Sequence, residues 1–219
     1  RTACRASSIV AVKESRYTMR MKKSVQRCPW VPSGNILYEK YHDTEWGVPV
    51  HDDRKIFEFL VLESAQAGLS WAIVLKKRTG YRKAFANFDP KKVSRFTTRD
   101  MQRLVSDAGI IRNRAKIAAA INNAKRFLEV QKEFGSFSAY MWSFVGGKTM
   151  HHRLRKLSDY PVKTKEADAW AHDLKKRGFS FLGPTVCYAH MQAVGMVNDH
   201  TIRCFRYKET VKAARRSPF

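Results

Sequence analysis

Residues 53–71 read DRKIFEFLVLESAQAGLSW, and this stretch decides how the chain folds. Its apolar residues recur at helical spacing, as Ile56 and Leu60 do, which predicts a helix over 53–66. On a helical projection Glu63 lies beside these two residues, so a carboxylate falls on the apolar face. Burying an ionised carboxylate is unfavourable unless it is paired. Glu63 therefore either bonds a neighbouring group inside the core or faces a pocket, and the pattern alone leaves both interpretations open.

Helical periodicity continues through most of the chain. The predicted helices cover residues 53–66, 70–78, 80–87, 90–95, 98–107, 113–132, 137–144, 164–177 and 184–194. Ser, Thr or Asp precedes several of them and glycines such as Gly80 separate or follow them, as helix starts and stops require. Residues 145–163 show the least periodicity and predict a loop. The predicted fold class is therefore all-α, a globule of eight or nine short helices.

The chain is strongly basic, and its charge is not confined to the ends. It carries 42 Lys and Arg against 19 Asp and Glu, a net charge of +23. Residues 28–200 alone hold 28 basic and 17 acidic residues, so the globular part is basic in its own right. Such an excess predicts a polyanionic partner. Nucleic acid fits better than a membrane, because the sequence has no apolar run of 18 residues and no basic amphipathic anchoring helix. A membrane- or RNA-associated protein stays an alternative from charge alone.

The cysteines and the N-terminal segment bear on the compartment. The four cysteines are Cys4, Cys28, Cys187 and Cys204. Their spacing suggests no disulfide framework, which favours a reducing, intracellular compartment. Residues 1–26 lack the apolar stretch of a secretory signal, and we expect them to form a disordered basic extension. Alternatives are an organelle transit segment, or a biological start at Met19 or Met21.

Residues 104–114 predict two helices joined by a tight turn. Gly109, which Ile110 follows, can adopt a positive φ and allow the close approach of another chain. Backbone N–H groups at the start of the second helix could then bind a DNA phosphate. Positive charge near this end comes from Arg112, Arg114 and Lys116. Helix-hairpin-helix modules hold the DNA backbone in this way without reading sequence. Because only one glycine is present where the generic hairpin has two, a plain packing corner is the alternative.

Two pairs of Cys and His lie near the two ends of the predicted globule. Cys28 and His42 form the first pair, and His200 and Cys204 form the second. His200 and Cys204 are four residues apart and would share one face of a helix. Two thiolates and two imidazoles suit tetrahedral Zn²⁺ and leave no coordination position open. Such a structural zinc would join the N- and C-terminal segments. The alternative is a pair of buried thiols and two surface histidines.

Aromatic residues crowd the part of the sequence around Glu63. They are Trp30, Tyr38, Tyr41, Trp46 and Trp71. Most aromatic side chains fill protein cores, so packing is one interpretation. Flat rings with a single carboxylate are also what a purine held outside the duplex requires, because the rings stack on the base and the acid accepts hydrogen bonds from its edge. The cluster is therefore a candidate base pocket.

Taken together, these motifs resemble DNA-3-methyladenine glycosylase I, a family of bacterial repair enzymes within the helix-hairpin-helix DNA glycosylases. The matching blocks are RCPW (27–30), YHDTEWGVP (41–49), LESAQAGLSW (62–71), VLKKR (74–78), DAGIIR (107–112), WSFV (142–145), KKRGF (175–179) and VNDH (197–200). DAGIIR fits the family's own hairpin, which accounts for the missing second glycine. The resemblance covers residues 27–208 as one catalytic domain and leaves the extension at 1–26 and a basic tail at 209–219 outside it.

The resemblance implies a monomeric, cytoplasmic enzyme that flips 3-methyladenine out of alkylated double-stranded DNA and hydrolyses its glycosidic bond, leaving an abasic site. It implies one structural zinc and assigns its ligands as Cys28, His42, His200 and Cys204. It assigns DNA contacts to the hairpin around Gly109, Ile110, Arg112 and Arg114. A glycosylase for another alkylated base, or a non-catalytic helix-hairpin-helix DNA-binding protein, are the alternatives.

The resemblance also assigns the base pocket. Glu63 takes the position of the acid that recognises the base, Tyr41 and Trp71 are its stacking partners, and Trp30 and Tyr38 line the pocket. Trp46 matches the motif, but we expect it to serve packing. Methylation at N3 makes the adenine cationic, so the base leaves as a neutral molecule and needs little help from a general acid. Consistent with this, the part of the sequence after the helix at 113–132 shows no Asp of the type that other members of the superfamily use.

Overall fold

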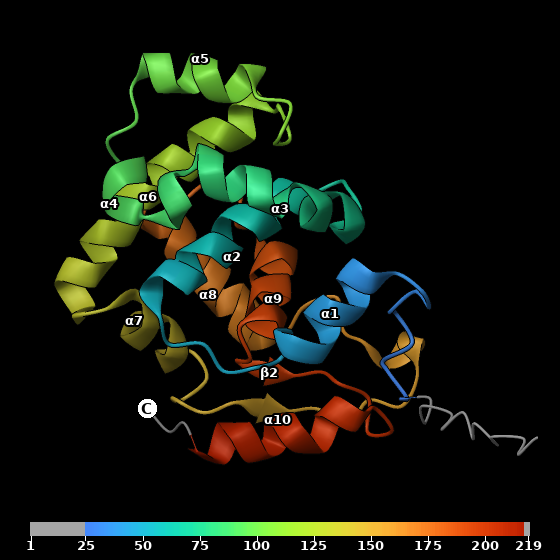
Figure 1. Ribbon diagram of the computed structural model, residues 1–219. Coiled ribbons are helices and arrows are strands. Elements are labelled where there is room, and N and C mark those ends of the chain that lie inside the picture. Colours follow the sequence, from blue (N-terminus) through green and yellow to red (C-terminus); the bar gives the residue numbers. More distant parts are fainter. Residues whose placement is uncertain (1–24, 217–219) are drawn as a thin grey trace, which may run out of the picture.

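A computed structural model describes residues 25–216 of the protein (Figure 1). Helices dominate it, as predicted. The α-helices are α1 (Ile36–Thr44), α2 (Asp53–Gln66), α3 (Trp71–Ala84), α4 (Pro90–Val93), α5 (Thr98–Ser106), α6 (Arg114–Phe134), α7 (Phe137–Ser143), α8 (Lys165–Lys176), α9 (Pro184–Ala193) and α10 (Phe205–Arg216). Two short 3₁₀ turns, η1 (Ala86–Phe88) and η2 (Leu157–Asp159), and two strands, β1 (Met150–His151) and β2 (Val197–Asn198), complete the described part. Cys4 and almost all of the predicted N-terminal extension lie outside the described residues.

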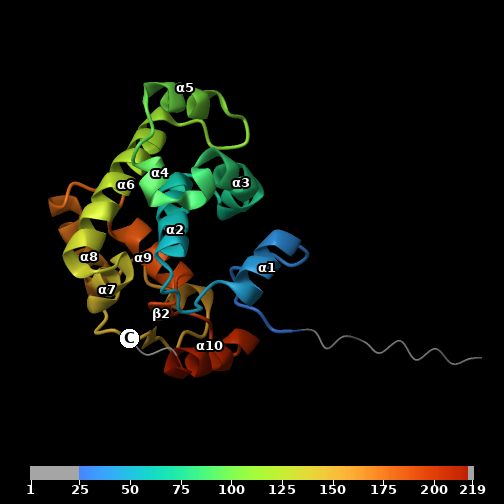
Figure 2. The same cartoon turned by 60° about the vertical axis from the view of Figure 1, so that its left-hand side comes forward.

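Helix α2 runs through the centre of the molecule. Its ten residues from Ile56 to Ala65 are all buried, so the helix is enclosed on every side rather than amphipathic. It packs against α3, α6, α7 and α9. Its start is fixed by the side chain of Asp52, which accepts a hydrogen bond from the backbone N–H of Lys55 at 2.8 Å. Figure 2 shows α2 and α9 lying between α1 on one side and α6, α7 and α8 on the other.

Helix α3 corrects one prediction. The two helices predicted at 70–78 and 80–87 are a single helix that ends at Ala84, with Gly80 inside it. Gly80 is not a helix stop, because its lack of a side chain serves packing. A Cβ on Gly80 would lie 2.7 Å from the carbonyl carbon of Gly109 in the turn between α5 and α6. The glycine therefore lets this turn rest directly on α3.

Gly80→Ala is expected to destabilise the protein by about 3 kcal/mol, because the added methyl group would overlap rigid backbone. The measurement is the free energy of unfolding in urea. Gly183→Ala is the matched control, since a Cβ there meets nothing within 4 Å, and its expected cost is below about 1 kcal/mol. Equal stability of the two variants would contradict the close approach of α3 and the turn.

Near both ends of the described part, the chain forms helices that periodicity did not predict. Helix α1 is short, and α10 extends beyond residue 208, where the resemblance ends, so the predicted tail is helical to Arg216. Thr210, inside that tail, is fully buried. The backbone N–H of Phe205 donates to the carbonyl of Gln26 at 3.0 Å, which brings the start of α10 to the N-terminal segment.

The predicted loop at 145–163 contains two short regular elements. Strand β1 pairs in parallel with β2, with Met150 opposite Val197. The pairing sets the residues that follow the two strands side by side. None of the described helices is both long enough and apolar enough to cross a membrane.

Candidate functional site

A cavity of about 390 Å³ opens beside the C-terminal half of α2. Its walls come from four parts of the chain: the N-terminal segment with α1, the α2–α3 region, the loop after β1, and α9. The residues that line it are Trp30, Tyr38, Tyr41, Trp46, Glu63, Gln66, Trp71, Leu157, Tyr160, Pro161, Val162, Thr185, Tyr188, Ala189 and Gln192. The volume lies in the range of small-ligand sites, and the lining is mainly apolar and aromatic.

The pocket residues predicted from the sequence all meet in this cavity. The ring centroids of Tyr41 and Trp71 are 5.3 Å apart, and those of Trp30 and Tyr38 are 6.1 Å apart. Trp46 packs as expected, with its ring 4.7 Å from that of Trp30, but it lines the cavity as well. The rings contact one another and together line the cavity, where their flat faces are available to a planar ligand.

Glu63 is the acidic residue of the cavity. It is only 4% exposed, and among the described residues no donor hydrogen-bonds to its carboxylate. Burial raises the pKa of Glu63 to about 8, because the charged form loses its hydration. A buried carboxylate at the edge of a cavity, without a partner, is poised to receive a cationic or hydrogen-bond-donating ligand.

Glu58, on the same helix, is a buried acid that bonds neighbouring groups inside the core, which is the alternative that the sequence left open for Glu63. Its carboxylate accepts hydrogen bonds from Arg78 Nε at 2.8 Å and Lys55 Nζ at 2.9 Å. Burial alone would raise the pKa of Glu58, but the hydrogen bonds and charges of Arg78 and Lys55 lower it. The buried acid that is paired within the core is thus Glu58, and Glu63 is the one that faces the cavity.

Arg78 also holds together the helices that carry the pocket. From α3 it donates to both carboxylate oxygens of Glu45, the residue that ends α1, at 2.8 and 2.7 Å. With its bond to Glu58 it therefore links α1, α2 and α3, which carry Tyr41, Glu63 and Trp71. Charge-assisted, two-pronged contacts of this kind fix geometry as well as adding stability.

Glu63→Gln is expected to stabilise the protein by about 3 kcal/mol at pH 7 and not at all at pH 4. The pKa of Glu63 is about 8 in the fold and about 4.3 in an unfolded chain. The folded state therefore binds an extra proton between these values, and stability falls as pH rises through this window. Unfolding curves of both proteins from pH 4 to 8.5 measure the difference. Parallel pH profiles would contradict the burial of an unpaired carboxylate.

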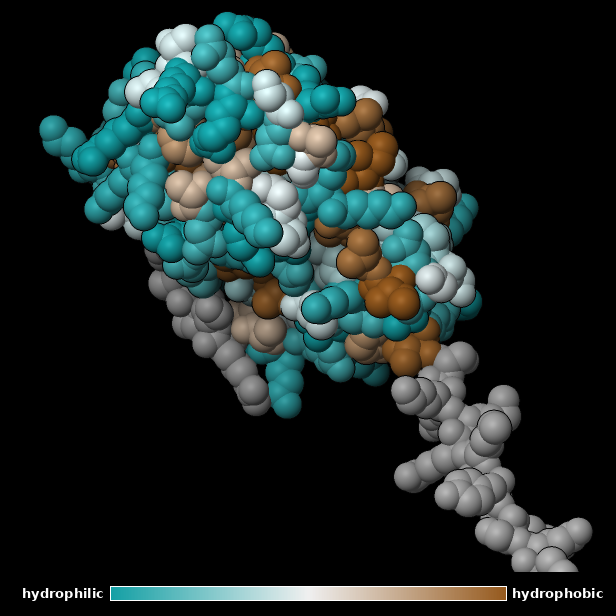
Figure 3. Space-filling model, turned by 45° about the horizontal axis from the view of Figure 1, so that its top comes forward, coloured by the Kyte–Doolittle hydropathy of each residue, from teal (hydrophilic) through white to brown (hydrophobic). Residues whose placement is uncertain are grey.

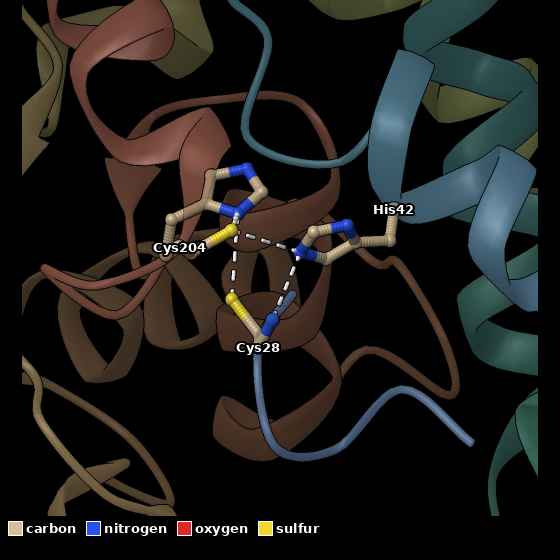
Figure 4. A group of neighbouring side chains, drawn as sticks. Cys28, His42 and Cys204 are labelled. Atoms are coloured by element: carbon tan, nitrogen blue, oxygen red, sulfur yellow. Dashed lines mark hydrogen bonds between the residues drawn. The ribbon is translucent and has the colours of Figure 1, made fainter. Parts of the chain in front are cut away.

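A second cluster lies next to the cavity. The sulfur and nitrogen atoms of Cys28, His42, His200 and Cys204 all lie within 4.8 Å of one another, and all four residues are buried. Figure 4 shows Cys28, His42 and Cys204 pointing toward a common centre from the N-terminal segment, α1 and the residue before α10. Cys28 Sγ is 3.4 Å from His200 Nδ1, and Cys204 Sγ is 3.4 Å from His42 Nε2. This is a candidate metal site of two thiols and two imidazoles.

The outer nitrogens of the two histidines have partners that fit such a site. His42 Nδ1 donates to Asp43 Oδ1 at 2.7 Å, and His200 Nε2 donates to the carbonyl of Trp46 at 3.0 Å. These bonds leave His42 Nε2 and His200 Nδ1 without protons and facing the sulfurs, as metal ligation requires. Arg27 in turn pairs with Asp43 at 2.7 Å. Sequence reasoning missed Arg27 and Asp43, although each adjoins a predicted ligand.

The cluster and the cavity share a wall. Trp30 follows Cys28 by two residues, Tyr41 precedes His42, and the ring of Trp46 lies 4.7 Å from that of His200. Three of the aromatic residues of the pocket are therefore held in place by the segment that the cluster ties to the C-terminal part of the chain.

Two helices joined by a turn are present between α5 and α6, with Gly109, Arg112 and Arg114 exposed and Ile110 buried. The positive φ expected at Gly109 is wrong, because this glycine keeps an ordinary backbone conformation and packs against Gly80 of α3. The N–H of Gly109 donates to Asp107 Oδ1 at 2.7 Å, which stabilises the turn. Lys116 does not add charge to this turn as expected. Its Nζ instead donates to the carbonyls of Ala65 at 2.9 Å and Ala67 at 2.5 Å, at the end of α2.

The remaining wall of the cavity was not predicted. It consists of Thr185, Tyr188, Ala189 and Gln192 on α9 and of the loop around η2. The sequence of α9 shows only the apolar pattern of a core helix, so no local signal marks these residues. Cys187 on α9 is buried, and its sulfur contacts the carbonyl of Leu182, so this residue serves packing.

A comparison with known protein families finds one that covers most of this chain. The family described as methyladenine glycosylase matches residues 30–207. The chain belongs to this family. The DNA-3-methyladenine glycosylase 1 of Escherichia coli is 49% identical over 183 residues, which cover 84% of this chain and 97% of that protein.

Solved structures agree with the sequence comparison. A crystal structure of 3-methyladenine DNA glycosylase I has a TM-score of 0.80 and 49% identity, and the match covers 82% of this chain and 98% of that one. A variant of 3-methyladenine DNA glycosylase I in complex with 3-methyladenine has a TM-score of 0.78 and 36% identity, with 80% and 94% covered. The methyladenine glycosylase fold is therefore that of this chain.

Proposed function

We propose that this protein is a DNA-3-methyladenine glycosylase of base excision repair. It takes 3-methyladenine from alkylated double-stranded DNA into its aromatic cavity, hydrolyses the bond between the base and the deoxyribose, and leaves an abasic site. The observation that carries the proposal is Glu63, a buried carboxylate without a partner among the described residues, at the edge of a cavity lined by aromatic rings. The E. coli relative and the relative bound to 3-methyladenine support it.

Glu63 supplies the charge that recognises the damaged base. N3-methylated adenine in DNA is cationic, and an ionised Glu63 favours this form and accepts hydrogen bonds from its edge. Tyr41 and Trp71 stack on the base, and Trp30 and Tyr38 close the pocket. Because Glu63 is buried, the attraction between its carboxylate and a cation is stronger than it would be in solvent.

The reaction then needs little further chemistry. A water oxygen attacks C1′, the bond from C1′ to N9 breaks, and its electron pair neutralises the positive charge of the base. The attacking water loses a proton to solvent. The pocket contributes by holding the base and sugar in a reactive geometry and by binding the charged state.

Zinc is the metal that we propose for the cluster of Cys28, His42, His200 and Cys204. The donor set and the orientation of both imidazoles fit one tetrahedral Zn²⁺. Because four protein ligands fill its coordination, the ion serves structure: it ties the N-terminal segment to the residues before α10. We assign no catalytic step to it.

The turn around Gly109 and Ile110, with Arg112 and Arg114, is our proposal for a helix-hairpin-helix contact with the DNA backbone. Exposed backbone N–H groups at the start of α6 and the two arginines can bind phosphates without reading bases. We further propose that the protein acts as a monomer.

The experiment is to incubate the protein with methylated duplex DNA and to identify the free bases by chromatography. The expected product is 3-methyladenine, together with abasic sites in the DNA. Predominant release of another base, such as 7-methylguanine, would favour the alternative of a glycosylase for a different adduct. Tight, salt-sensitive duplex binding without any released base would favour a non-catalytic DNA-binding protein.

A further inference from the structure

The loop after β1 exposes two large apolar side chains at the mouth of the cavity. Leu157 is 59% exposed and Val162 is 72% exposed, and both line the cavity together with Tyr160 and Pro161. Other large apolar residues exposed in the described part also sit on elements that carry pocket residues: Ile36 and Leu37 on α1, Leu69 before α3 and Ile73 within it. Of these exposed side chains, Leu157 and Val162 line the cavity itself, and we call these two residues the apolar lip. Figure 3 shows hydrophobic side chains gathered along the right-hand side of this face of the molecule.

The loop is held firmly, so the exposure of these side chains is a property of the fold. The Asp159 carboxylate accepts hydrogen bonds from the backbone N–H groups of Arg155 at 2.8 Å and Lys156 at 3.1 Å. Before this turn, Leu154 is buried and its carbonyl accepts a hydrogen bond from the N–H of Ile202 at 2.9 Å. After it, Tyr160 turns inward, where its hydroxyl is buried and its side chain lines the cavity.

Positive charge accompanies the apolar residues. Arg153, Arg155 and Lys156 are exposed, and in the part of the chain that the structure describes none of the three forms a salt bridge. The charges of Arg155 and Lys156 do act on the nearby carboxyl group of Asp159 and lower its pKa. Exposed cations without a salt bridge, beside the apolar side chains of Leu157 and Val162, fit a nucleic acid as partner, because it offers phosphates next to sugar and base surfaces. A purely apolar protein partner would leave these charges without counterparts.

The position of the loop relative to the hairpin suggests which part of the DNA it meets. In Figure 1 the turn between α5 and α6 lies at the top, and the segment around η2 lies at the lower right, beyond α1. The cavity lies between them, because α2, α3 and the η2 loop all contribute to it. A nucleotide that enters the cavity stays joined to the strand through a phosphate on each side. The hairpin can hold only one of these sides.

We propose that residues 153–163 form a second DNA-contacting element. Arg153, Arg155 and Lys156 bind phosphates on the side of the flipped nucleotide away from the hairpin. Leu157 and Val162 pack against the sugar and base next to it. This inference rests on the proposed function, since it names a further contact of the same substrate.

The charge contribution is tested with the triple variant Arg153→Gln, Arg155→Gln, Lys156→Gln. Binding to a duplex with an uncleavable abasic-site analogue is measured across a range of salt concentrations. The slope of log K against log salt is expected to become shallower by about 0.9 for each phosphate that the variant no longer neutralises, so by about 2 to 3 in total. The matched control removes the same charge from the far end of α6 and α8 with Lys132→Gln, Lys175→Gln, Lys176→Gln. An unchanged slope in the loop variant, or an equal change in both, would overturn the proposal.

The apolar contribution is tested with Leu157→Ser, Val162→Ser, using excision under single-turnover conditions. The expected result is a rate about ten-fold lower on methylated duplex, with thermal stability within a few degrees of the parent. Phe181→Ser, at another exposed apolar residue, is the control and is expected to keep the parent rate. An excision rate of the double variant within two-fold of the parent rate would overturn the proposed role of Leu157 and Val162. If the parent protein itself releases no methylated base, the proposed glycosylase function is wrong. This outcome is distinct from a failure of the loop proposal, in which the parent and the double variant both release the base at similar rates.

Discussion

Glu63→Gln is expected to lower the rate of 3-methyladenine release by about 100-fold or more. The substitution keeps the shape of the side chain and removes its charge. Two charge-assisted hydrogen bonds to a cationic base, each contributing about 1.5 to 3 kcal/mol, account for such an effect. The measurement is single-turnover excision from methylated duplex DNA. Glu129→Gln, which removes an exposed carboxylate on α6, is the control and is expected to keep the parent rate.

The same substitution should remove a pH dependence. Because the pKa of Glu63 is raised to about 8, the free enzyme carries a neutral side chain below that pH and an ionised one above it. Only the ionised form attracts a cationic base, so kcat/KM is expected to rise with pH up to about 8 and then level off. In Glu63→Gln this rise should be absent. A Glu63→Gln variant that excises at the parent rate would contradict the assignment of Glu63.

Cys204→Ser is expected to abolish metal binding and to lower the melting temperature by about 10 °C. Loss of a structural metal removes a cross-link between chain segments far apart in the sequence, and a loss of about 3 to 5 kcal/mol gives a shift of this size in a domain of this length. Affinity for free 3-methyladenine should fall as well, because Trp30, Tyr41 and Trp46 lie on the segment that the cluster holds. Metal content, calorimetry and base binding are the measurements.

Cys187→Ser separates the loss of the metal from the loss of a buried thiol. Cys187 is as buried as Cys204 but lies outside the cluster, with its sulfur against the carbonyl of Leu182. This variant is expected to keep one zinc per chain and the parent affinity for the base. A Cys204→Ser protein that retains a full equivalent of zinc would contradict the ligand set.

Helical periodicity predicted most of the fold because most of these helices bury one face or more. Periodicity gave wrong or missing helices where contacts with distant parts of the chain decide the local structure. Glycine is typical of helix ends, yet Gly80 lies inside α3, because the turn between α5 and α6 packs against it. Helices α1 and α10 were not predicted, since α1 is short and α10 is largely polar, and both are held by contacts with distant segments.

The sequence predicted only part of the candidate site, because only some of its residues have side chains that indicate a function by themselves. Glu63, Tyr41, Trp71 and the four Cys and His residues have side chains whose chemistry is visible in the sequence. The wall from α9 and the loop around η2 is not visible, because its residues are ordinary core and loop types that gain their role from position. Lys116 looked like a DNA-facing cation, but the carbonyls at the end of α2 bind it instead.

The sequence by itself determined the helical class, the basic surface and the set of reactive side chains, because these follow from residue type and local spacing. Only the tertiary structure decided which buried acid is paired. Glu58 and Glu63 lie five residues apart on one helix, and both are buried. Arg78, twenty residues further along the chain, reaches Glu58 from α3 and leaves Glu63 to the cavity. Whether a buried carboxylate is paired depends on which side chain from a distant part of the sequence lies beside it, and only the tertiary structure determines this.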